Sequence, residues 1–178
     1  MSTLKIPVSI QDHIQGPQDA MNTLVEYGDF QCPHCAAAHP IIQKIQKSFG
    51  KNLRFVFRHF PLSNAHEYAF TAAVASEAAA RQNKFWVMHD MLFERQAEFS
   101  ENAFSLFAED LGLNMHHFKK DLADKSLAQR VETDFESGMR SGVNGTPSFY
   151  INEHKYEGSY DFASMHQAIV GRIQKSMV

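Results

Sequence analysis

The sequence predicts a mixed α/β fold with a helical segment inserted between its strands, on three observations. Residues 22–58 show a strand pattern, then helical spacing of apolar residues, then an alternating strand pattern. Residues 64–142 show helical spacing throughout. Residues 148–173 combine two short strand patterns around a tight turn with a last helix. A strand, a helix and a second strand in this order predict two parallel strands in one sheet.

Composition limits what kind of protein this is. The chain has 178 residues, 44% of them hydrophobic, which suits one domain with a real core or a domain with a sizeable insertion. The net charge of −3 and the scattered basic residues give no support for nucleic-acid binding. Two cysteines are too few for a disulfide-stapled scaffold. No apolar run reaches the roughly 18 residues that a membrane-spanning helix needs.

The N-terminal segment carries no recognisable leader. Residues 1–7 lack a basic region followed by an apolar run, so a cytoplasmic location is expected. A periplasmic chain whose leader had been removed would look the same. Residues 1–20 are polar and irregular, and we interpret them as an arm with a short edge strand near residues 6–9.

Residues 22–28 form the first predicted core strand, and Glu26 is the anomaly within it. The continuous apolar character of this strand suits coverage on both faces. A carboxylate in the middle of such a strand is costly unless it is paired or protonated. An edge position facing water and an ion pair with Arg58, on the neighbouring strand, are the alternatives.

Cys32 and Cys35 lie three positions apart, in a Cys-Pro-His-Cys motif between the first strand and the following helix. At that place Cys32 meets the unpaired N–H groups and the dipole of the helix start, which favour a thiolate over a thiol. The thiolate is the species that attacks disulfides. Cys35 follows one helical turn later, within reach to close a disulfide. The motif therefore indicates redox chemistry.

Half a zinc site and two incidental thiols are the alternative interpretations of this motif. A structural zinc ion needs about four ligands. His34, His39 and Asp29 are the nearby candidates, and the chain has no second pair of cysteines. We therefore expect no metal site and no cofactor. The remaining histidines, including His116 and His117, scatter over helices and loops and are expected at the surface.

The other elements follow from start and stop signals. The helix after the motif runs to about residue 48, is kinked by Pro40 and ends at Gly50. Predicted helix caps are Ser63 or Asn64, Ser100, Asn114, Asp124 and Asp161, with Gly112 and Gly142 as helix ends. The aromatic and methionine side chains of residues 64–142 are expected to form a small helical core. Asn152 and Glu153 make the tight turn of the hairpin.

The order of elements and the motif residues resemble the thioredoxin fold, and in particular the bacterial DsbA family of thiol:disulfide interchange proteins. The matching residues are Cys32-Pro33-His34-Cys35, Glu26 six positions earlier, Pro40 at the helix kink and Thr146-Pro147 before a strand. Arg58-His59-Phe60-Pro61-Leu62 and Gly145-Thr146-Pro147-Ser148-Phe149 also resemble a leaderless subgroup of that family. The resemblance covers residues 20–175. It implies a discontinuous thioredoxin-like domain (residues 1–62 and 143–178) and an inserted helical domain (residues 63–142).

The resemblance also implies roles for the motif residues. Cys32 is expected to be the attacking, solvent-facing thiol and Cys35 the buried resolving thiol. His34 is expected to set the redox poise, because its ring can donate to the Cys32 thiolate or add positive charge beside it. Glu26 is expected to move a proton to or from Cys35 through water, with a pKa raised by burial. Pro33 completes the catalytic set.

Thr146, Pro147 and Phe30 are the expected substrate-binding residues. A cis bond before Pro147 would turn the Thr146 backbone outward beside Cys32, where an extended substrate could pair as an added strand. An ordinary trans proline at the start of a strand is the alternative.

These features predict a thiol:disulfide oxidoreductase that is a monomer and exchanges disulfides with proteins, or with glutathione mixed disulfides, through a Cys32 intermediate. In a reducing cytosol a protein with DsbA-like poise would be almost wholly reduced, which favours reduction or reshuffling of partner disulfides. A redox-regulated chaperone or binding module and a redox sensor are the alternatives. An intact pair of cysteines at this spacing favours the enzyme.

Overall fold

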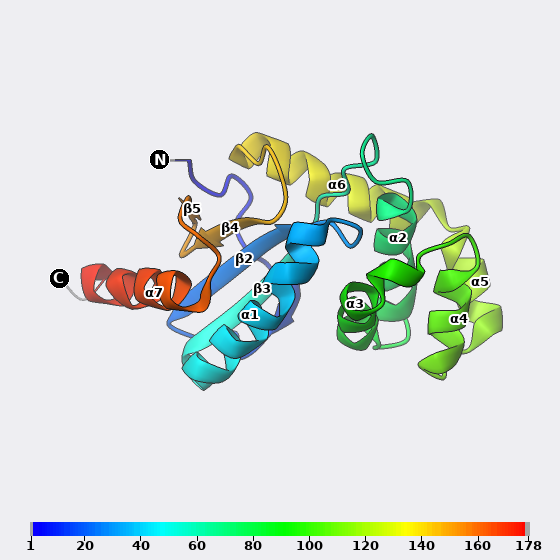
Figure 1. The fold of residues 1–178 in the computed structure, drawn as a ribbon, viewed down its shortest axis with the longest axis horizontal. Coiled ribbons are helices and arrows are strands. Elements are labelled where there is room, and N and C mark those ends of the chain that lie inside the picture. The colour runs from blue at the N-terminus through cyan, green and yellow to red at the C-terminus, as the bar shows by residue number, and fades with distance from the viewer. Residues whose placement is uncertain (1, 177–178) are drawn as a thin grey trace.

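The computed structural model describes residues 2–176 and has the predicted mixed α/β architecture (Figure 1). The strands in that range are β1 (His13–Gln15), β2 (Asn22–Gly28), β3 (Leu53–His59), β4 (Ser148–Ile151) and β5 (His154–Tyr156). The helices are α1 (Pro33–Phe49), α2 (Ala69–Ala80), α3 (Phe85–Glu94), α4 (Ala103–Asp110), α5 (Met115–Leu122), α6 (Lys125–Ser141) and α7 (Phe162–Ser176), with short 3-10 turns at Gly50–Asn52 and Gln96–Glu98.

The strands form one five-stranded sheet in the order β1-β3-β2-β4-β5. β2 and β3 run parallel from the pair Asn22–Leu53 to the pair Gly28–His59, as the sequence predicts. β4 lies antiparallel to β2 on its other side, and β5 completes the hairpin. β2 is therefore the central strand, and its carboxyl end delivers the chain directly to the cysteine motif.

Alternation along the strands divides the core into two layers. One layer, which includes Leu24, Phe55 and Phe57, continues through the buried residues of α1, α2 and α3. The other layer, which includes Val25 and Val56, is smaller and lies under the N-terminal arm and the end of α6. Figure 1 shows α1 in front of the sheet, α6 above the sheet in this view, and α2 to α5 gathered to one side. The inserted helices therefore share the larger hydrophobic cluster with the sheet.

Three predicted helix caps are confirmed and two are wrong. Asp161, directly before α7, accepts a hydrogen bond from the Ser164 N–H at 2.9 Å. Asn114 accepts a hydrogen bond from the His117 N–H at 3.0 Å, and Asp124 accepts one from the Ser126 N–H at 2.8 Å. α2 does not begin at residue 63 or 64 but at Ala69, because residues 61–68 are held in a loop by side chains that precede the cysteine motif. α4 begins at Ala103 instead of directly after residue 100, and no side chain caps it.

The edge strand expected near residues 6–9 is also wrong. The edge strand is β1, in which His13 pairs with Phe57 antiparallel to β3. The carbonyl oxygens of Ile6 and Pro7 accept hydrogen bonds from the Arg58 guanidinium instead of joining a strand ladder. Pro7 has no N–H to donate to such a ladder, which also disfavours strand pairing there.

Gly138 lies where α6 packs closely against Phe60 and against Tyr27 of the central strand. A Cβ atom at residue 138 would lie 2.6 Å from Phe60 Cδ2 and 3.0 Å from Tyr27 Cδ1. A β-carbon there must displace aromatic rings that are themselves packed in the smaller core layer.

We expect Gly138→Ala to lower the free energy of unfolding by about 1–3 kcal/mol, because overpacking outweighs the helix propensity gained. Gly171→Ala is the matched control, since it is also a helical glycine and a Cβ there would meet nothing within 4 Å. It should leave stability unchanged or raise it by up to about 1 kcal/mol. Urea denaturation of both variants measures the two effects, and equal stabilities would contradict this account of the α6 packing.

Candidate active site

The cysteine motif forms the start of α1. Cys32 is the residue before the first helical position and has extended φ and ψ angles of −75° and 122°. Pro33 occupies the first turn, where its missing N–H costs no helical hydrogen bond. The backbone N–H groups of His34 and Cys35 are therefore available to the Cys32 sulfur.

The environment of Cys32 favours its thiolate. A hydrogen bond from the Cys35 thiol is the largest influence that lowers the pKa of Cys32, from 9.0 to about 5. Partial burial opposes this effect, while the Thr146 side chain and the N–H groups of Cys35 and His34 add to it. At neutral pH the reduced protein therefore holds a thiolate at Cys32.

Cys35 has the opposite character. Its side chain is fully buried, and burial is the main cause that raises the pKa of Cys35 well above its ordinary value. Its hydrogen bond to Cys32 and the charges of Glu26 and Cys32 raise the pKa further. In the reduced protein without substrate, Cys32 is therefore a thiolate and Cys35 a thiol.

Cys32 is less open to solvent than the sequence suggested. Only 4% of Cys32 is exposed, so the expectation of a solvent-facing thiol is wrong for this conformation. The Cys32 sulfur lies 3.4 Å from the carbonyl oxygen of Thr146, to which its thiol can donate. Its own carbonyl accepts a hydrogen bond from Gln96, at 3.0 Å, so that the inserted segment encloses the residue from another side.

Glu26 lies in the middle of the central strand and is 2% exposed. The edge position considered from the sequence is therefore wrong. The expected ion pair with Arg58 is wrong too. Glu26 is opposite Phe57 in β3, and Arg58, the residue after Phe57, points to the other face of the sheet. Arg58 binds Asp12 at 2.7 Å and the Tyr27 hydroxyl at 3.0 Å instead.

The carboxyl group of Glu26 is poorly satisfied. Its Oε1 atom is buried and has no hydrogen-bond partner among the described residues. Burial, followed by the negative charge of Cys32, raises the pKa of Glu26 from 4.5 to about 8. The predicted raised pKa therefore has the expected physical cause, although its role in proton transfer stays a hypothesis.

The loop before β4 completes the site. The peptide bond between Thr146 and Pro147 is cis, and both residues are half-buried beside the cysteines. The Thr146 hydroxyl is buried without a hydrogen-bond partner among the described residues. A hydroxyl in this position is available to donate to a Cys32 thiolate, consistent with its lowering of the Cys32 pKa.

Two predicted site residues lie differently from expectation. The ring of His34 is turned toward Tyr160, with Nδ1 3.1 Å from the hydroxyl oxygen, so His34 acts on Cys32 through its backbone N–H. Phe30 is 1% exposed and stacks on Phe57, which rules out direct contact between its ring and a substrate in this conformation. The residue is buried because it continues the apolar alternation of β2 into the core.

The sequence analysis did not identify Asp29 as the residue that organises the site. Its fully buried carboxylate accepts hydrogen bonds from the N–H groups of Gln31, at 2.7 Å, and Leu62, at 2.9 Å. The same carboxylate lies 2.7 Å from Nδ1 of His66. Asp29 directly follows the predicted first strand and lies three residues before Cys32, and this position was the available signal in the sequence. Gln96, which donates to the Cys32 carbonyl oxygen, lies more than sixty residues away, and no feature of the sequence indicated its role.

A family model described as thioredoxin matches residues 9–170. Curated relatives include a protein named Na(+)/H(+) antiporter NhaA 1 from Salinispora arenicola, which is 41% identical over 93% of this chain and 26% of its own length. A protein named Na(+)/H(+) antiporter NhaA from Herminiimonas arsenicoxydans is 42% identical over 84% of this chain and 24% of its own length. The chain therefore spans about a quarter of the length of the curated relatives it matches.

None of the helices within residues 2–176 has the length and apolar character needed to cross a membrane.

Solved structures with the same fold cover nearly the whole chain. BdbD from Bacillus subtilis, in its oxidised form, has a TM-score of 0.84 and 25% identity over 98% of this chain and 100% of its own. A thioredoxin-like oxidoreductase from Silicibacter pomeroyi has a TM-score of 0.80 and 25% identity over 94% of each chain. Wolbachia pipientis alpha-DsbA1 has a TM-score of 0.83 over 98% of this chain and 96% of its own, and at 21% identity it shows the fold alone.

The difference between the two thiols leads to a prediction for Cys32. The thiolate of the reduced protein should titrate near pH 5, followed by its ultraviolet absorbance. Cys35→Ala should raise that pKa clearly, because the largest stabilising influence on the thiolate is lost. His34→Ala should raise it less, since the backbone N–H remains and the ring faces Tyr160. A larger rise for His34→Ala than for Cys35→Ala would show that the ring acts on the thiolate after all.

The burial of Glu26 leads to a prediction for stability. Between pH 4.5 and about 8 the folded protein keeps the Glu26 proton that the unfolded chain has lost, so stability should fall as the pH rises. The slope contributed by one such group is at most about 1.4 kcal/mol per pH unit, and it should disappear above pH 8. Glu26→Gln should remove this slope.

The Glu26 experiment is best done in a Cys32→Ser background, in which ionisation of Cys32 cannot add a slope of opposite sign. Burial still raises the Glu26 pKa in that background, because burial is its main cause. Urea denaturation at several pH values measures the slopes. Parallel curves for the parent and the Glu26→Gln variant would mean that the carboxyl group titrates normally.

Proposed function

This chain belongs to the thioredoxin family, and from that premise we propose that it is a DsbA-like thiol:disulfide oxidoreductase. The proposed reaction exchanges the Cys32–Cys35 dithiol or disulfide with a disulfide or dithiol of a partner. Its main support is the contrast between the two sulfurs: the pKa of Cys32 is lowered to about 5, while Cys35 is fully buried with a raised pKa. Only Cys32 is then an effective nucleophile at neutral pH.

In the proposed reaction, the Cys32 thiolate attacks one sulfur of a partner disulfide. A bond forms between Cys32 and that sulfur, and the other partner sulfur leaves as a thiolate that takes a proton from water. Cys35 then loses its proton and attacks the Cys32 sulfur, which forms the Cys32–Cys35 disulfide and releases the first partner sulfur. The partner has gained two electrons and this protein has lost two. The reverse sequence oxidises a partner dithiol.

Glu26 is the proposed acceptor of the Cys35 proton. While Cys32 is a thiolate, its charge is one of the two influences that raise the pKa of Glu26. That charge disappears when Cys32 enters the mixed disulfide, so the Glu26 carboxyl group ionises more easily at that stage. A carboxylate then becomes available when Cys35 must lose its proton, transferred directly or through water.

The Thr146 backbone is the proposed docking point for the partner chain. Its carbonyl oxygen lies 3.4 Å from the Cys32 sulfur. When Cys32 is a thiolate it no longer donates to this oxygen, which leaves the oxygen free to accept an N–H from an extended partner segment. Such a segment would add to the loop as a short strand and bring its disulfide next to Cys32.

The environment of Cys32 also bears on the direction of electron flow. Stabilising the thiolate stabilises the reduced protein, which makes its disulfide more oxidising. Thioredoxin lies near about −270 mV and DsbA near about −120 mV, a gap of roughly 7 kcal/mol for two electrons. A protein near the DsbA end would be oxidised only in an oxidising compartment. In a reducing one it would reduce or reshuffle disulfides of proteins or of glutathione.

Partners are proposed from the same chemistry. Proteins with accessible thiols or disulfides, and glutathione mixed disulfides, are the candidate substrates. The curated relatives, in which the matched segment is about a quarter of a protein named as an antiporter, add a membrane protein as a candidate partner. A redox-regulated chaperone remains the second candidate function, supported by the apolar hollow of about 390 Å³ formed by Leu62, Phe70 and Phe135 among others.

The proposed reaction predicts which cysteine variant captures partners. Cys35→Ser should accumulate mixed disulfides with partner proteins, because Cys32 can still attack but nothing resolves the product. Cys32→Ser should accumulate almost none and should lose insulin reduction. Non-reducing gels of the purified variants with a disulfide-containing substrate measure both effects. Accumulation on the Cys32→Ser variant alone would reverse the assigned roles.

The chaperone alternative predicts a different pattern. Suppression of aggregation of an unfolding protein should be unchanged in a Cys32→Ser, Cys35→Ser variant if binding is the main function. If the wild-type protein reduces insulin and neither form suppresses aggregation, the oxidoreductase proposal stands and the chaperone alternative is wrong.

A further inference from the structure

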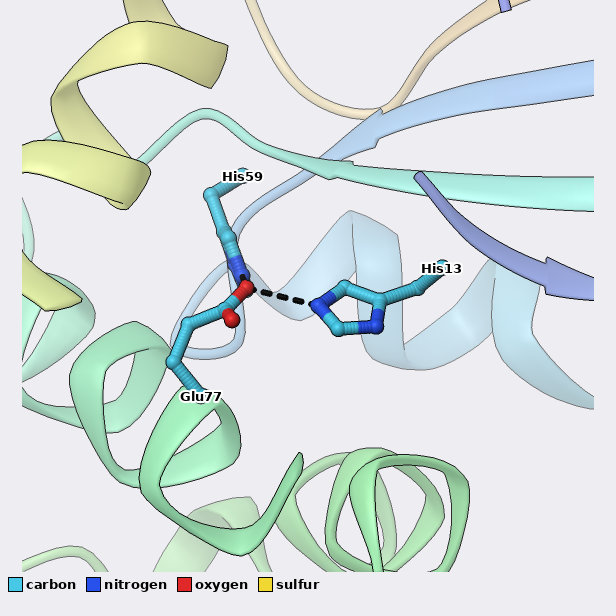
Figure 2. Close-up of side chains that lie close together, drawn as sticks. All are labelled: His13, His59 and Glu77. Carbon is cyan, nitrogen blue, oxygen red and sulfur yellow. Dashed lines mark hydrogen bonds and ion pairs between the residues drawn. The ribbon is translucent and has the colours of Figure 1, made fainter. Parts of the chain in front are cut away.

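Three metal-ligating side chains meet inside the molecule, away from the cysteine pair (Figure 2). His13 comes from the edge strand β1, His59 from the last position of β3, and Glu77 from α2. Figure 2 shows the two imidazole rings approaching the same carboxylate from different sides. We call these three residues the His13–His59–Glu77 cluster.

The ligand atoms of the cluster converge closely. The Nε2 atoms of His13 and His59 lie 2.7 Å and 2.8 Å from the same oxygen, Oε1 of Glu77. The side chains of His59 and Glu77 are 1% and 7% exposed, and that of His13 is 17% exposed. The cluster is therefore mostly enclosed, with one ligand that still reaches solvent.

The surroundings fix the direction of each ligand. The His13 ring stacks on Phe85 at a centroid distance of 3.4 Å. The other ring nitrogen of His59, Nδ1, is buried without a partner among the described residues, so Nε2 is the nitrogen committed to the cluster. The backbone N–H of His59 is held by Asp134, at 3.1 Å. Both rings are thus oriented toward the Glu77 carboxylate before any ion binds.

We propose that the His13–His59–Glu77 cluster binds a divalent transition metal ion, of which Zn²⁺ is the best match to two imidazoles and one carboxylate. Each ring would bind the ion through Nε2 and carry its hydrogen on Nδ1 instead, so that both imidazoles stay neutral ligands. Ligands about 2.0–2.1 Å from a tetrahedral zinc ion lie about 3.3 Å apart, so each contact must lengthen by roughly 0.5 Å. The short edge strand that carries the partly exposed His13 is the element best able to shift by that amount.

Charge balance supports a cation at this place. Glu77 supplies one negative charge within the cluster, and the buried carboxylate of Asp134 adds a second one nearby. Arg130 donates a hydrogen bond to Asp134 at 2.7 Å, and its positive charge offsets part of this second negative charge. A divalent ion would therefore not be left uncompensated in a buried environment.

The ion would have a structural role, in which it ties the edge of the sheet to the inserted helices. Two ligands come from the neighbouring strands β1 and β3, and the third comes from α2 in the inserted segment. The His59 ring lies 5.9 Å, between centroids, from the ring of Phe30, two residues before Cys32. Binding would thus stiffen the support beneath the cysteine motif without placing the ion in contact with the sulfurs.

The test uses residues 1–178 without a histidine tag and with both cysteines replaced by serine, so that thiolates cannot hold the metal. Titration with Zn²⁺ in a calorimeter should give one site per chain, and Co²⁺ should give the visible absorption of a low-symmetry tetrahedral complex. His13→Ala should weaken Zn²⁺ binding about tenfold or more, because one of three protein ligands is lost. Zn²⁺ should also raise the melting temperature of the parent but not that of His13→Ala.

His39→Ala is the matched control, because His39 belongs to a second group of possible ligands, with His89 and Asp90. It should leave both the stoichiometry and the Zn²⁺ affinity unchanged. Glu77→Gln should abolish binding, with circular dichroism to confirm that the variant folds. The proposal is overturned if the parent shows no saturable binding, or if His13→Ala and a folded Glu77→Gln bind Zn²⁺ as the parent does. The cluster would then be a purely hydrogen-bonded one.

Discussion

Three ionisable groups, Cys32, Cys35 and Glu26, share one buried region at the carboxyl end of the central strand, and their negative charges compete. Each of the two groups with a raised pKa is raised partly by another member of the set. The start of α1 decides the outcome, because its N–H groups and the Cys35 thiol all favour charge on the Cys32 sulfur. In the reduced protein at neutral pH, Cys32 therefore carries the negative charge among these three groups, and chemistry at Cys32 changes the ionisation of the other two.

The inserted helices are connected to this region by hydrogen bonds as well as by the hydrophobic cluster. Gln96, in a short 3-10 turn, donates to the carbonyl oxygens of Phe30 and Cys32 at 2.8 Å and 3.0 Å. The backbone N–H of Tyr68, before α2, donates to the Gln31 side chain. A displacement of the inserted segment would therefore disturb the backbone of the cysteine motif itself.

Local signals in the sequence were sufficient to predict three features. These are the parallel pairing of β2 and β3, the caps of α5 and α6, and the position of the cysteines at the start of a helix. Features that depend on residues distant in the sequence were not predictable. The start of α2 is delayed because Asp29 and Gln31 bind the loop before it. The orientation of His34 depends on Tyr160. Histidines expected at the surface, such as His59 and His89, are buried, because His59 meets Glu77 of α2 and His89 packs from α3 against Phe57 of the sheet.

The irregular N-terminal arm has a consequence for how this protein can be altered. Arg58 is 2% exposed, and its guanidinium is held by Asp12 and by the carbonyl oxygens of Ile6 and Pro7. If the arm were removed or displaced, a cation would remain within the protein without its counter-ion, which is strongly destabilising. Residues 6–12 therefore compensate the buried charge of Arg58, and truncations or fusions at that end must leave this segment in place.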